Sequence, residues 1–261
     1  MKYSIYTSCF NIIKNNFNYW EFTIPKWLDF LENGEKGEIV ICINSSEDDT
    51  LKIIKDKFSS SNAIKIIESS FDYTDYSFDG KIKNQALQNC KNEICLGLDL
   101  DEYLSPNKES WDSFASQLLQ SNYRSLFIPV VDLCKGEDYY KSIGFKWYMH
   151  KQGLKRGVWP YAKLNNGKID VNKSDTCELL DEDDNLVQTA SLIDKPNVEL
   201  LKKYDLPFVI HLGWLNWANR KEQNKTWQPV WSNRAGYEIN NIIHQENAFD
   251  KIEVFKHNLK I

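Results

Sequence analysis

The first hundred residues alternate short apolar runs with helical patterns, and this alternation constrains the fold more than any other feature. Four apolar runs predict β-strands, at 2–7, 38–43, 63–68 and 94–98. Helical patterns separate these runs, and we expect Pro25 to break the first helix, over 12–32, into two pieces. Such alternation is typical of an α/β fold with a largely parallel sheet and right-handed crossovers.

Polar segments follow three of the predicted strands, at 7–11, 44–50 and 99–102. In open α/β sheets, ligands bind beyond the carboxyl ends of the strands, which meet at one edge when the strands are parallel. The segment at 44–50 also opens a helix, so backbone N–H groups are available there. The sequence therefore predicts one binding site, to which all three segments contribute.

The third segment carries two aspartates, Asp99 and Asp101, directly after a buried strand. Residues two apart share a face of an extended chain, so both carboxylates can aim at one point if the chain stays extended. Paired carboxylates are costly unless a positive charge lies between them, and a divalent cation that holds phosphate oxygens meets this need. A lone D-x-D motif also fits a solvated acidic turn or a helix N-cap. The convergence of three polar segments favours the cation site.

The remainder of the chain has a different pattern. We expect a helix up to about Gln120, strands at 126–133, 145–150 and 206–212, and a hairpin of 177–180 with 186–190. We interpret the acidic run at 181–185 as a solvated turn. No linker interrupts the chain, so we expect one compact unit.

Composition and charge limit the classes of function and the cellular location that we expect. The net charge of −5 makes general nucleic-acid binding an unfavoured hypothesis, because such proteins usually carry a basic face. No run of 18 apolar residues occurs, so we expect no membrane span, and the polar start does not predict a signal peptide. The six cysteines form no C-x-x-C motif, so we expect reduced thiols and a cytoplasmic protein, with peripheral membrane association left open.

Three motifs between residues 3 and 110 occur in the order and spacing of one enzyme family. They are the first strand with its TSCFN loop, the segment NSSEDDTLKIIKD, and the segment KIKNQALQNCKNEICLGLDLDEYLSP. Together they resemble the GT-A glycosyltransferases, especially the family 2 type. Beyond residue 135 the resemblance is weak.

The resemblance implies a metal-dependent glycosyltransferase that moves a sugar from a nucleotide-diphosphate donor to a glycan or other hydroxyl acceptor. It implies a GT-A fold in which 1–133 binds the nucleotide sugar and 134–261 binds the acceptor. The family's donor contacts, with a UDP-sugar expected, fall on Thr7, Ser8, Asn44, Ser45, Ser46, Lys83, Asn84, Asp99 and Leu100. Its Mn²⁺ or Mg²⁺ ligands fall on Asp99, Asp101 and His211, although His211 also fits a buried imidazole at a strand end.

An inverting enzyme of this kind also needs a carboxylate that deprotonates the acceptor hydroxyl. Our candidates are Asp175 and Glu178, with Glu137 and Asp138 as the second choice. The family's usual base motif is not evident, so the inverting mechanism is only the family default. The oligomeric state is not predicted.

Two other function classes stay open. A sugar nucleotidyltransferase has a similar sheet, but the first loop lacks the G-x-G-x-R segment that such enzymes usually carry. A non-catalytic glycan-binding protein on the same scaffold is the other alternative, and the intact Asp99 and Asp101 pair counts against it.

Overall fold

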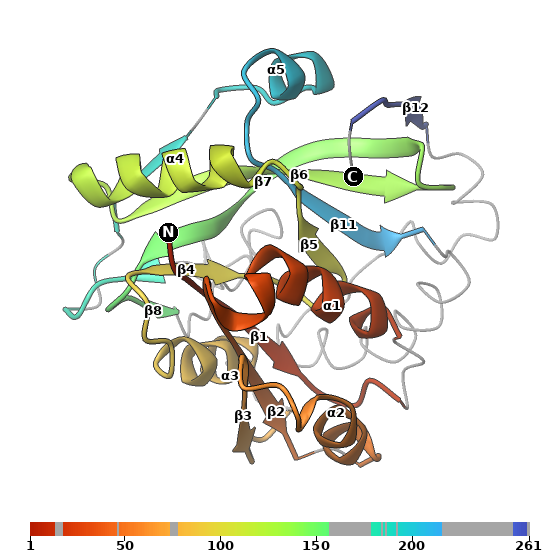
Figure 1. Ribbon diagram of the computed structural model, residues 1–261, viewed down its shortest axis with the longest axis vertical. Coiled ribbons are helices and arrows are strands. Elements are labelled where there is room, and N and C mark those ends of the chain that lie inside the picture. The colour runs from red at the N-terminus through yellow and green to blue at the C-terminus, as the bar shows by residue number, and fades with distance from the viewer. Residues whose placement is uncertain are drawn as a thin grey trace, which may run out of the picture.

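The computed structural model describes residues 1–13, 18–45, 47–73, 78–156, 179–183, 185, 187–191, 193–215 and 253–259. Four parallel strands form one side of its main sheet in the order β3-β2-β1-β4 (Figure 1). The strands are β1 (Tyr3–Cys9), β2 (Gly37–Asn44), β3 (Ile64–Ser69) and β4 (Ile94–Gly97). The helices between them are α1 (Trp20–Phe30), α2 (Thr50–Phe58) and α3 (Phe78–Leu87), and a 3₁₀ turn, η1 (Glu32–Gly34), follows α1.

The later strands extend the same sheet. The order continues β4-β7-β6-β11-β5, with β10 paired to β6 and β12 paired to β7. These strands are β5 (Glu102–Leu104), β6 (Ser125–Cys134), β7 (Tyr139–Lys151), β10 (Thr189–Ser191), β11 (Val209–Trp214) and β12 (Phe255–Lys256). The remaining elements are α4 (Lys108–Gln120), α5 (Val198–Lys203) and a small separate sheet of β8 (Lys155–Arg156) with β9 (Leu179–Leu180).

The predicted fold class is confirmed. Helices flank a largely parallel α/β sheet, and antiparallel pairs of β7 with β4 and with β6 make the second part mixed. Because β6 and β11 run parallel to one another and β6 is antiparallel to β7, the strands β1, β2, β4, β6 and β11 all have the same direction. Their carboxyl ends therefore lie at one edge.

Alternate residues of β2 face two different hydrophobic cores. Ile39 and Ile41 pack in the larger core with residues of α1, α2 and α4, whereas Val40 and Cys42 pack in the smaller core with residues of α3. All four side chains are fully buried. A strand covered on both faces must be apolar throughout, which is why its sequence does not alternate.

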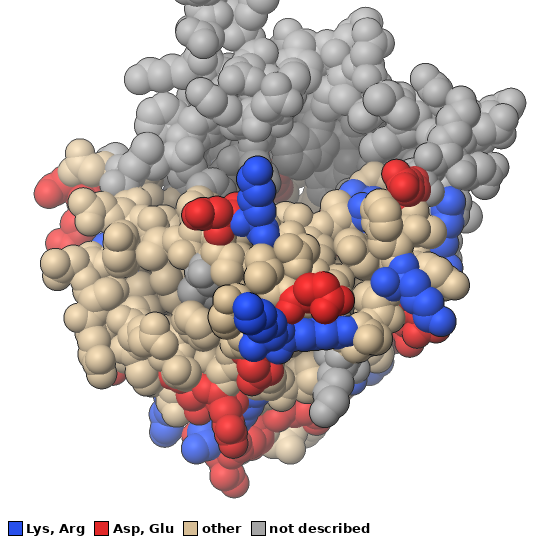
Figure 2. All heavy atoms as spheres, turned by 90° about the horizontal axis from the view of Figure 1, so that it is seen from above, with Lys and Arg blue, Asp and Glu red and all other residues tan. Residues whose placement is uncertain are grey.

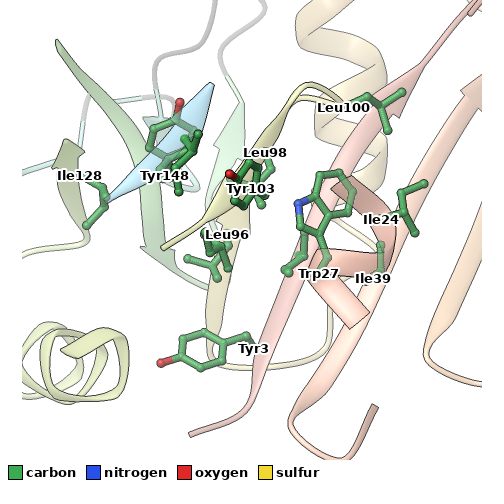
Figure 3. Packing of buried hydrophobic residues seen from close by; sticks show 14 of the residues in the cluster. Tyr3, Ile24, Trp27, Ile39, Leu96, Leu98, Leu100, Tyr103, Ile128 and Tyr148 are labelled. Carbon is green, nitrogen blue, oxygen red and sulfur yellow. The ribbon is translucent and has the colours of Figure 1, made fainter. Parts of the chain in front are cut away.

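Helix α1 fixes the segment after β4 from the larger core. Trp27 is fully buried, and its indole N–H donates to the backbone carbonyl of Glu102 at 2.9 Å. The hydroxyl of Thr23 donates to the carbonyl of Leu100 at 2.7 Å. Figure 3 shows the Trp27 ring with Tyr103 on one side and Ile24 on the other. The chain between β4 and β5 is therefore held on its core side by two hydrogen bonds.

The predicted break at Pro25 is wrong, because α1 continues through this residue. Proline removes the N–H that would bond the carbonyl four residues earlier, at Glu21. Glu21 is exposed, so water can satisfy this carbonyl, and the other side of the helix keeps its buried contacts.

The predicted hairpin of 177–180 with 186–190 is confirmed near its turn, where the N–H of Val187 donates to the carbonyl of Leu179 at 3.2 Å and the N–H of Asp181 donates to the carbonyl of Asn185 at 2.9 Å. The regular strand pairs lie elsewhere: β9 pairs with β8, and β10 pairs in parallel with β6. Glu182 and Asp183 are exposed, as expected for a solvated turn.

No helix in the described part of the chain is long and apolar enough to cross a membrane. Figure 2 shows basic and acidic side chains interspersed on the described part of one face, without a broad area of one sign.

Candidate functional site

The acidic motif forms a tight turn between β4 and β5. The backbone N–H of Glu102 donates to the carbonyl of Asp99 at 3.0 Å, and the N–H of Asp99 donates to Oε2 of Glu102 at 2.8 Å. The chain therefore does not stay extended, which was the condition for Asp99 and Asp101 to share a face. The two carboxylates instead belong to two neighbouring charge clusters.

The first cluster surrounds Asp99. Lys83 of α3 donates to its Oδ1 at 2.7 Å, and Lys146 of β7 donates to its Oδ2 at 2.5 Å. Burial alone would raise the pKa of Asp99, but the two ammonium groups outweigh it and hold this pKa well below its usual range. Asp99 is therefore ionised and paired on both oxygens.

Glu102 shares Lys146 with Asp99. Its side chain is almost fully buried, and its Oε1 accepts from Lys146 at 2.9 Å and from the Tyr148 hydroxyl at 2.6 Å. Burial raises the pKa of Glu102, and Lys146 opposes this shift. Burial would lower the pKa of Lys146, but Asp99 and Glu102 raise it well above its usual range. Lys146 is therefore a charged ammonium that lies between two carboxylates.

The second cluster brings together Asp101 and His211, which are 110 residues apart in the sequence. Nε2 of His211 lies 3.2 Å from Oδ2 of Asp101, and its Nδ1 lies 2.6 Å from Oδ1 of Asp132. Burial would lower the pKa of His211, but Asp101 and Asp132 outweigh it and raise this pKa to about 10. Asp132 in turn forms an ion pair with Lys141 and accepts a hydrogen bond from the Ser142 hydroxyl, both of β7.

The backbone of β11 packs against Asp101 and His211. The N–H of Leu212 donates to the carbonyl of Asp101 at 2.8 Å. A Cβ atom at Gly213 would lie 2.6 Å from Nε2 of His211 and 2.9 Å from Oδ2 of Asp101. A side chain at this position would clash with both polar atoms, so the β11 backbone packs closely against the pair.

The residues of the second cluster fit a divalent cation when His211 gives up its Nε2 proton, which its raised pKa otherwise retains. A carboxylate oxygen and a neutral imidazole nitrogen are ordinary ligands of Mn²⁺. A ligating histidine usually donates its other ring N–H to a carboxylate, and Asp132 occupies that position on His211. Within the described ranges, no three His, Cys, Asp or Glu side chains group together as a metal site.

Several residues that were predicted to contact the nucleotide sugar lie inside strands or bind neighbouring backbone groups instead. Thr7 and Ser8 lie within β1 rather than in a loop, and Thr7 is buried, with no hydrogen-bond partner for its Oγ1 among the described residues. Asn44 binds the backbone of Phe71 with both ends of its amide, at 3.0 and 2.8 Å. Ser45 binds the carbonyl of Ser69.

Of the other predicted residues, Asn84 accepts a hydrogen bond from the N–H of Arg156 at 3.2 Å. Leu100 is buried in the larger core, where only its backbone is polar. Ser46 and both candidate bases, Asp175 and Glu178, lie outside the described residues. Their roles remain predictions.

The sequence interpretation missed Lys146, Tyr148 and Asp132. Lys146 and Tyr148 are two apart in a strand, so they share a face, and this spacing was a usable signal. Nothing local indicated Asp132, because its partner His211 is 79 residues away.

No family model and no curated protein matches the chain. Among solved structures, the chain is similar to S. aureus TarS 1-349 in complex with UDP-GlcNAc, with 24% identity, a TM-score of 0.37, and 51% of this chain and 35% of that chain covered. TarS 1-349 alone gives 15% identity and a TM-score of 0.43 over 97% of this chain and 69% of that chain. The mannosyltransferase PcManGT from Pyrobaculum calidifontis, in complex with GDP-Man and Mn²⁺, gives 16% identity and a TM-score of 0.34, with 51% of this chain and 35% of that chain covered. The chain thus spans about a third of the length of the two liganded structures that it matches.

Proposed function

We propose that this chain is a glycosyltransferase that uses a divalent cation and moves a sugar from a nucleotide-diphosphate donor to a hydroxyl acceptor. One observation carries the proposal: Asp101, in the turn at the carboxyl-end edge of β4, meets His211 of β11, with 3.2 Å between Oδ2 and Nε2. This edge is where ligands bind in α/β sheets. The pair offers a carboxylate oxygen and an imidazole nitrogen as metal ligands.

In this proposal, Asp101 and His211 hold Mn²⁺ or Mg²⁺, which neutralises charge on the departing diphosphate when it is bound. Asp132 keeps the His211 ring oriented. Lys83 and Lys146, both paired with Asp99, lie in the neighbouring first cluster. The ends of β1 and β2, with Ser8, Ser45 and Ser46, would receive the nucleoside.

The acceptor and its base belong to the second half of the chain. We propose Asp175 or Glu178 as the base that takes the proton from the acceptor hydroxyl, in an inverting transfer. Replacement of the true base by its amide should lower sugar transfer by orders of magnitude and leave donor binding unchanged. If both amide variants keep full turnover, the base lies elsewhere or the enzyme retains configuration.

A thermal-shift screen tests the proposed function. The full chain is heated with UDP-, GDP-, CMP- and dTDP-sugars, with and without Mn²⁺. A ligand at ~100 times its dissociation constant adds about 2.7 kcal/mol to the free energy of unfolding. We expect a rise in melting temperature with one nucleotide class, in the presence of Mn²⁺ only. No rise with any donor would contradict the proposal, and a rise with a nucleoside triphosphate instead would favour a nucleotidyltransferase.

A further inference from the structure

We propose that the 253–259 segment is a positioning element of the metal site. It holds the turn between β6 and β7, and thereby the side chain of Lys141, which contacts Asp132, the partner of His211. The inference rests on the proposed function, since the ion belongs to that site. Figure 1 shows β12, which lies in this segment, beside the β6–β7 hairpin.

Both strands that flank β6 carry one extra residue next to Asp132. In β7 the extra residue is Lys141, because Ser142 lies opposite Asp132 and Tyr140 lies opposite the next residue of β6. In β11 the register also shifts by one residue directly after His211. A β-bulge leaves its extra residue unpaired and re-aims the side chain. The pairing of β6 with β7 therefore does not by itself fix the direction of Lys141.

Lys141 contacts both Asp132 and the end of β11. Its Nζ lies 3.2 Å from Oδ2 of Asp132 and 4.2 Å from the centroid of the Trp214 ring, a favourable cation–π geometry. Oδ1 of the same Asp132 lies 2.6 Å from Nδ1 of His211. A displaced Lys141 would therefore free Asp132 to turn away from His211, and the imidazole would lose the contact that orients it.

The strand β12 supports β7 at the residues that come directly before the bulge. It pairs with Tyr139 and Tyr140. Because Tyr140 also pairs with β6, β12 must lie along the opposite edge of β7. The ring of Phe255 in β12 packs on the ring of Tyr140, with 5.6 Å between the centroids. The backbone that leads into Lys141 is thus held from both sides.

His257 holds the turn itself. Its side chain is buried, and its backbone N–H donates to the carbonyl of Asp138 at 2.9 Å. Its Nδ1 accepts from the N–H of Leu259 at 3.2 Å, so Nε2 carries the ring proton and donates to the carbonyl of Glu137 at 2.7 Å. Both ring nitrogens are therefore used to join the 253–259 segment to the turn.

Substitution of His257 tests the inference in the full chain. Mn²⁺ titration by electron paramagnetic resonance gives the metal affinity, and hydrogen exchange of the 139–142 amides reports local opening. His257→Ala should speed this exchange and weaken Mn²⁺ binding by about 3- to 10-fold, less than the loss of a direct partner of a ligand. His257→Gln retains an N–H donor for the Glu137 carbonyl and should recover most of the affinity.

Asn197→Ala is the control for stability. The Asn197 side chain caps α5 by accepting from the N–H of Leu200 at 3.0 Å, so its loss should destabilise the chain through another element. Mn²⁺ binding should be unchanged in this variant. An equal loss of affinity in Asn197→Ala and His257→Ala would overturn the inference, because the effect would then follow from stability alone.

Wild-type Mn²⁺ affinity in folded His257→Ala would also overturn it. If His257→Ala does not fold, Phe255→Ala decides, since it removes only an exposed ring from Tyr140. Unchanged affinity and exchange in that variant would contradict the inference. A wild-type chain that binds Mn²⁺ but no nucleotide sugar would contradict the proposed function and leave the inference intact, whereas a wild-type chain that binds no Mn²⁺ would overturn both.

Discussion

At the scale of single residues, the geometry of the site depends on groups outside the Asp101 and His211 pair. Asp132 binds Nδ1 of His211 and so directs Nε2 toward Asp101. Gly213 is important because it lacks a side chain. Neither role could be predicted from the sequence, since a pair such as His211 and Asp132 is created by two strands that come together only in the fold.

Replacement of Asp132 by asparagine tests the orientation of His211. An amide can still accept from Nδ1 but lacks the charge, so we expect Mn²⁺ affinity to fall by about 10- to 100-fold. Ser142→Ala, which removes a neighbouring hydroxyl that donates to Asp132, is the matched control and should have a much smaller effect. Both are measured by Mn²⁺ titration. Wild-type affinity in Asp132→Asn would show that the ring is oriented by other contacts.

Gly213→Ala tests the close approach of the β11 backbone to the metal pair. The added methyl group would lie within 3 Å of both polar atoms, so the two side chains must shift and metal binding should be lost, with the fold checked by circular dichroism. Gly144→Ala is the control, because its Cβ would meet only Val130 Cγ1 at 3.6 Å, an ordinary contact. Equal metal affinity in the two variants would contradict the proposed location of the ion.

At the scale of elements, the sequence predicted the four parallel strands because their apolar runs are clear and separated by helical patterns. The strand β5 was missed because it has only three residues and follows an acidic segment. The strand β7 was predicted too short, since its first half is polar enough to resemble a loop. The turn that separates Asp99 from Asp101 depends on α1, whose contacts with this segment join residues more than 70 positions apart.

Thr23→Val tests the connection between α1 and the turn. Valine keeps the shape of threonine but leaves the carbonyl of Leu100 without its buried donor, which costs about 1–3 kcal/mol. We expect this loss in the free energy of unfolding in urea, together with weaker Mn²⁺ binding. Thr23→Ser keeps the hydroxyl and should retain the metal affinity. If both variants bind Mn²⁺ as wild type does, α1 does not hold the site in place.

At the scale of the whole molecule, one sheet joins the two halves that the sequence pattern separates, and the site lies where their strand ends meet. The sequence could predict that polar segments converge at this edge, because parallel strands require it. It could not predict which side chains pair there, because β7 brings Lys146 to Asp99 and β11 brings His211 to Asp101.

The acid stability of the whole chain should depend on His150. This side chain is fully buried against the Tyr6 hydroxyl, and burial lowers its pKa from 6.5 to about 3. Between these values the unfolded chain binds a proton that the folded chain does not, so the free energy of unfolding falls as pH decreases, by up to about 1.4 kcal/mol per pH unit. His150→Gln should show a shallower decrease between pH 6 and 4.5, in urea denaturation on both chains. Parallel slopes would contradict this account.

The central claim is that Asp101 and His211 hold the ion through which a nucleotide sugar binds. The most direct measurement is calorimetric titration of the donor found in the screen into wild type and Asp101→Asn, each with and without Mn²⁺. We predict binding to wild type in Mn²⁺ only, and at least about tenfold weaker binding to the folded variant under the same conditions. Equal, Mn²⁺-dependent binding to both proteins would contradict the claim and place the ion elsewhere.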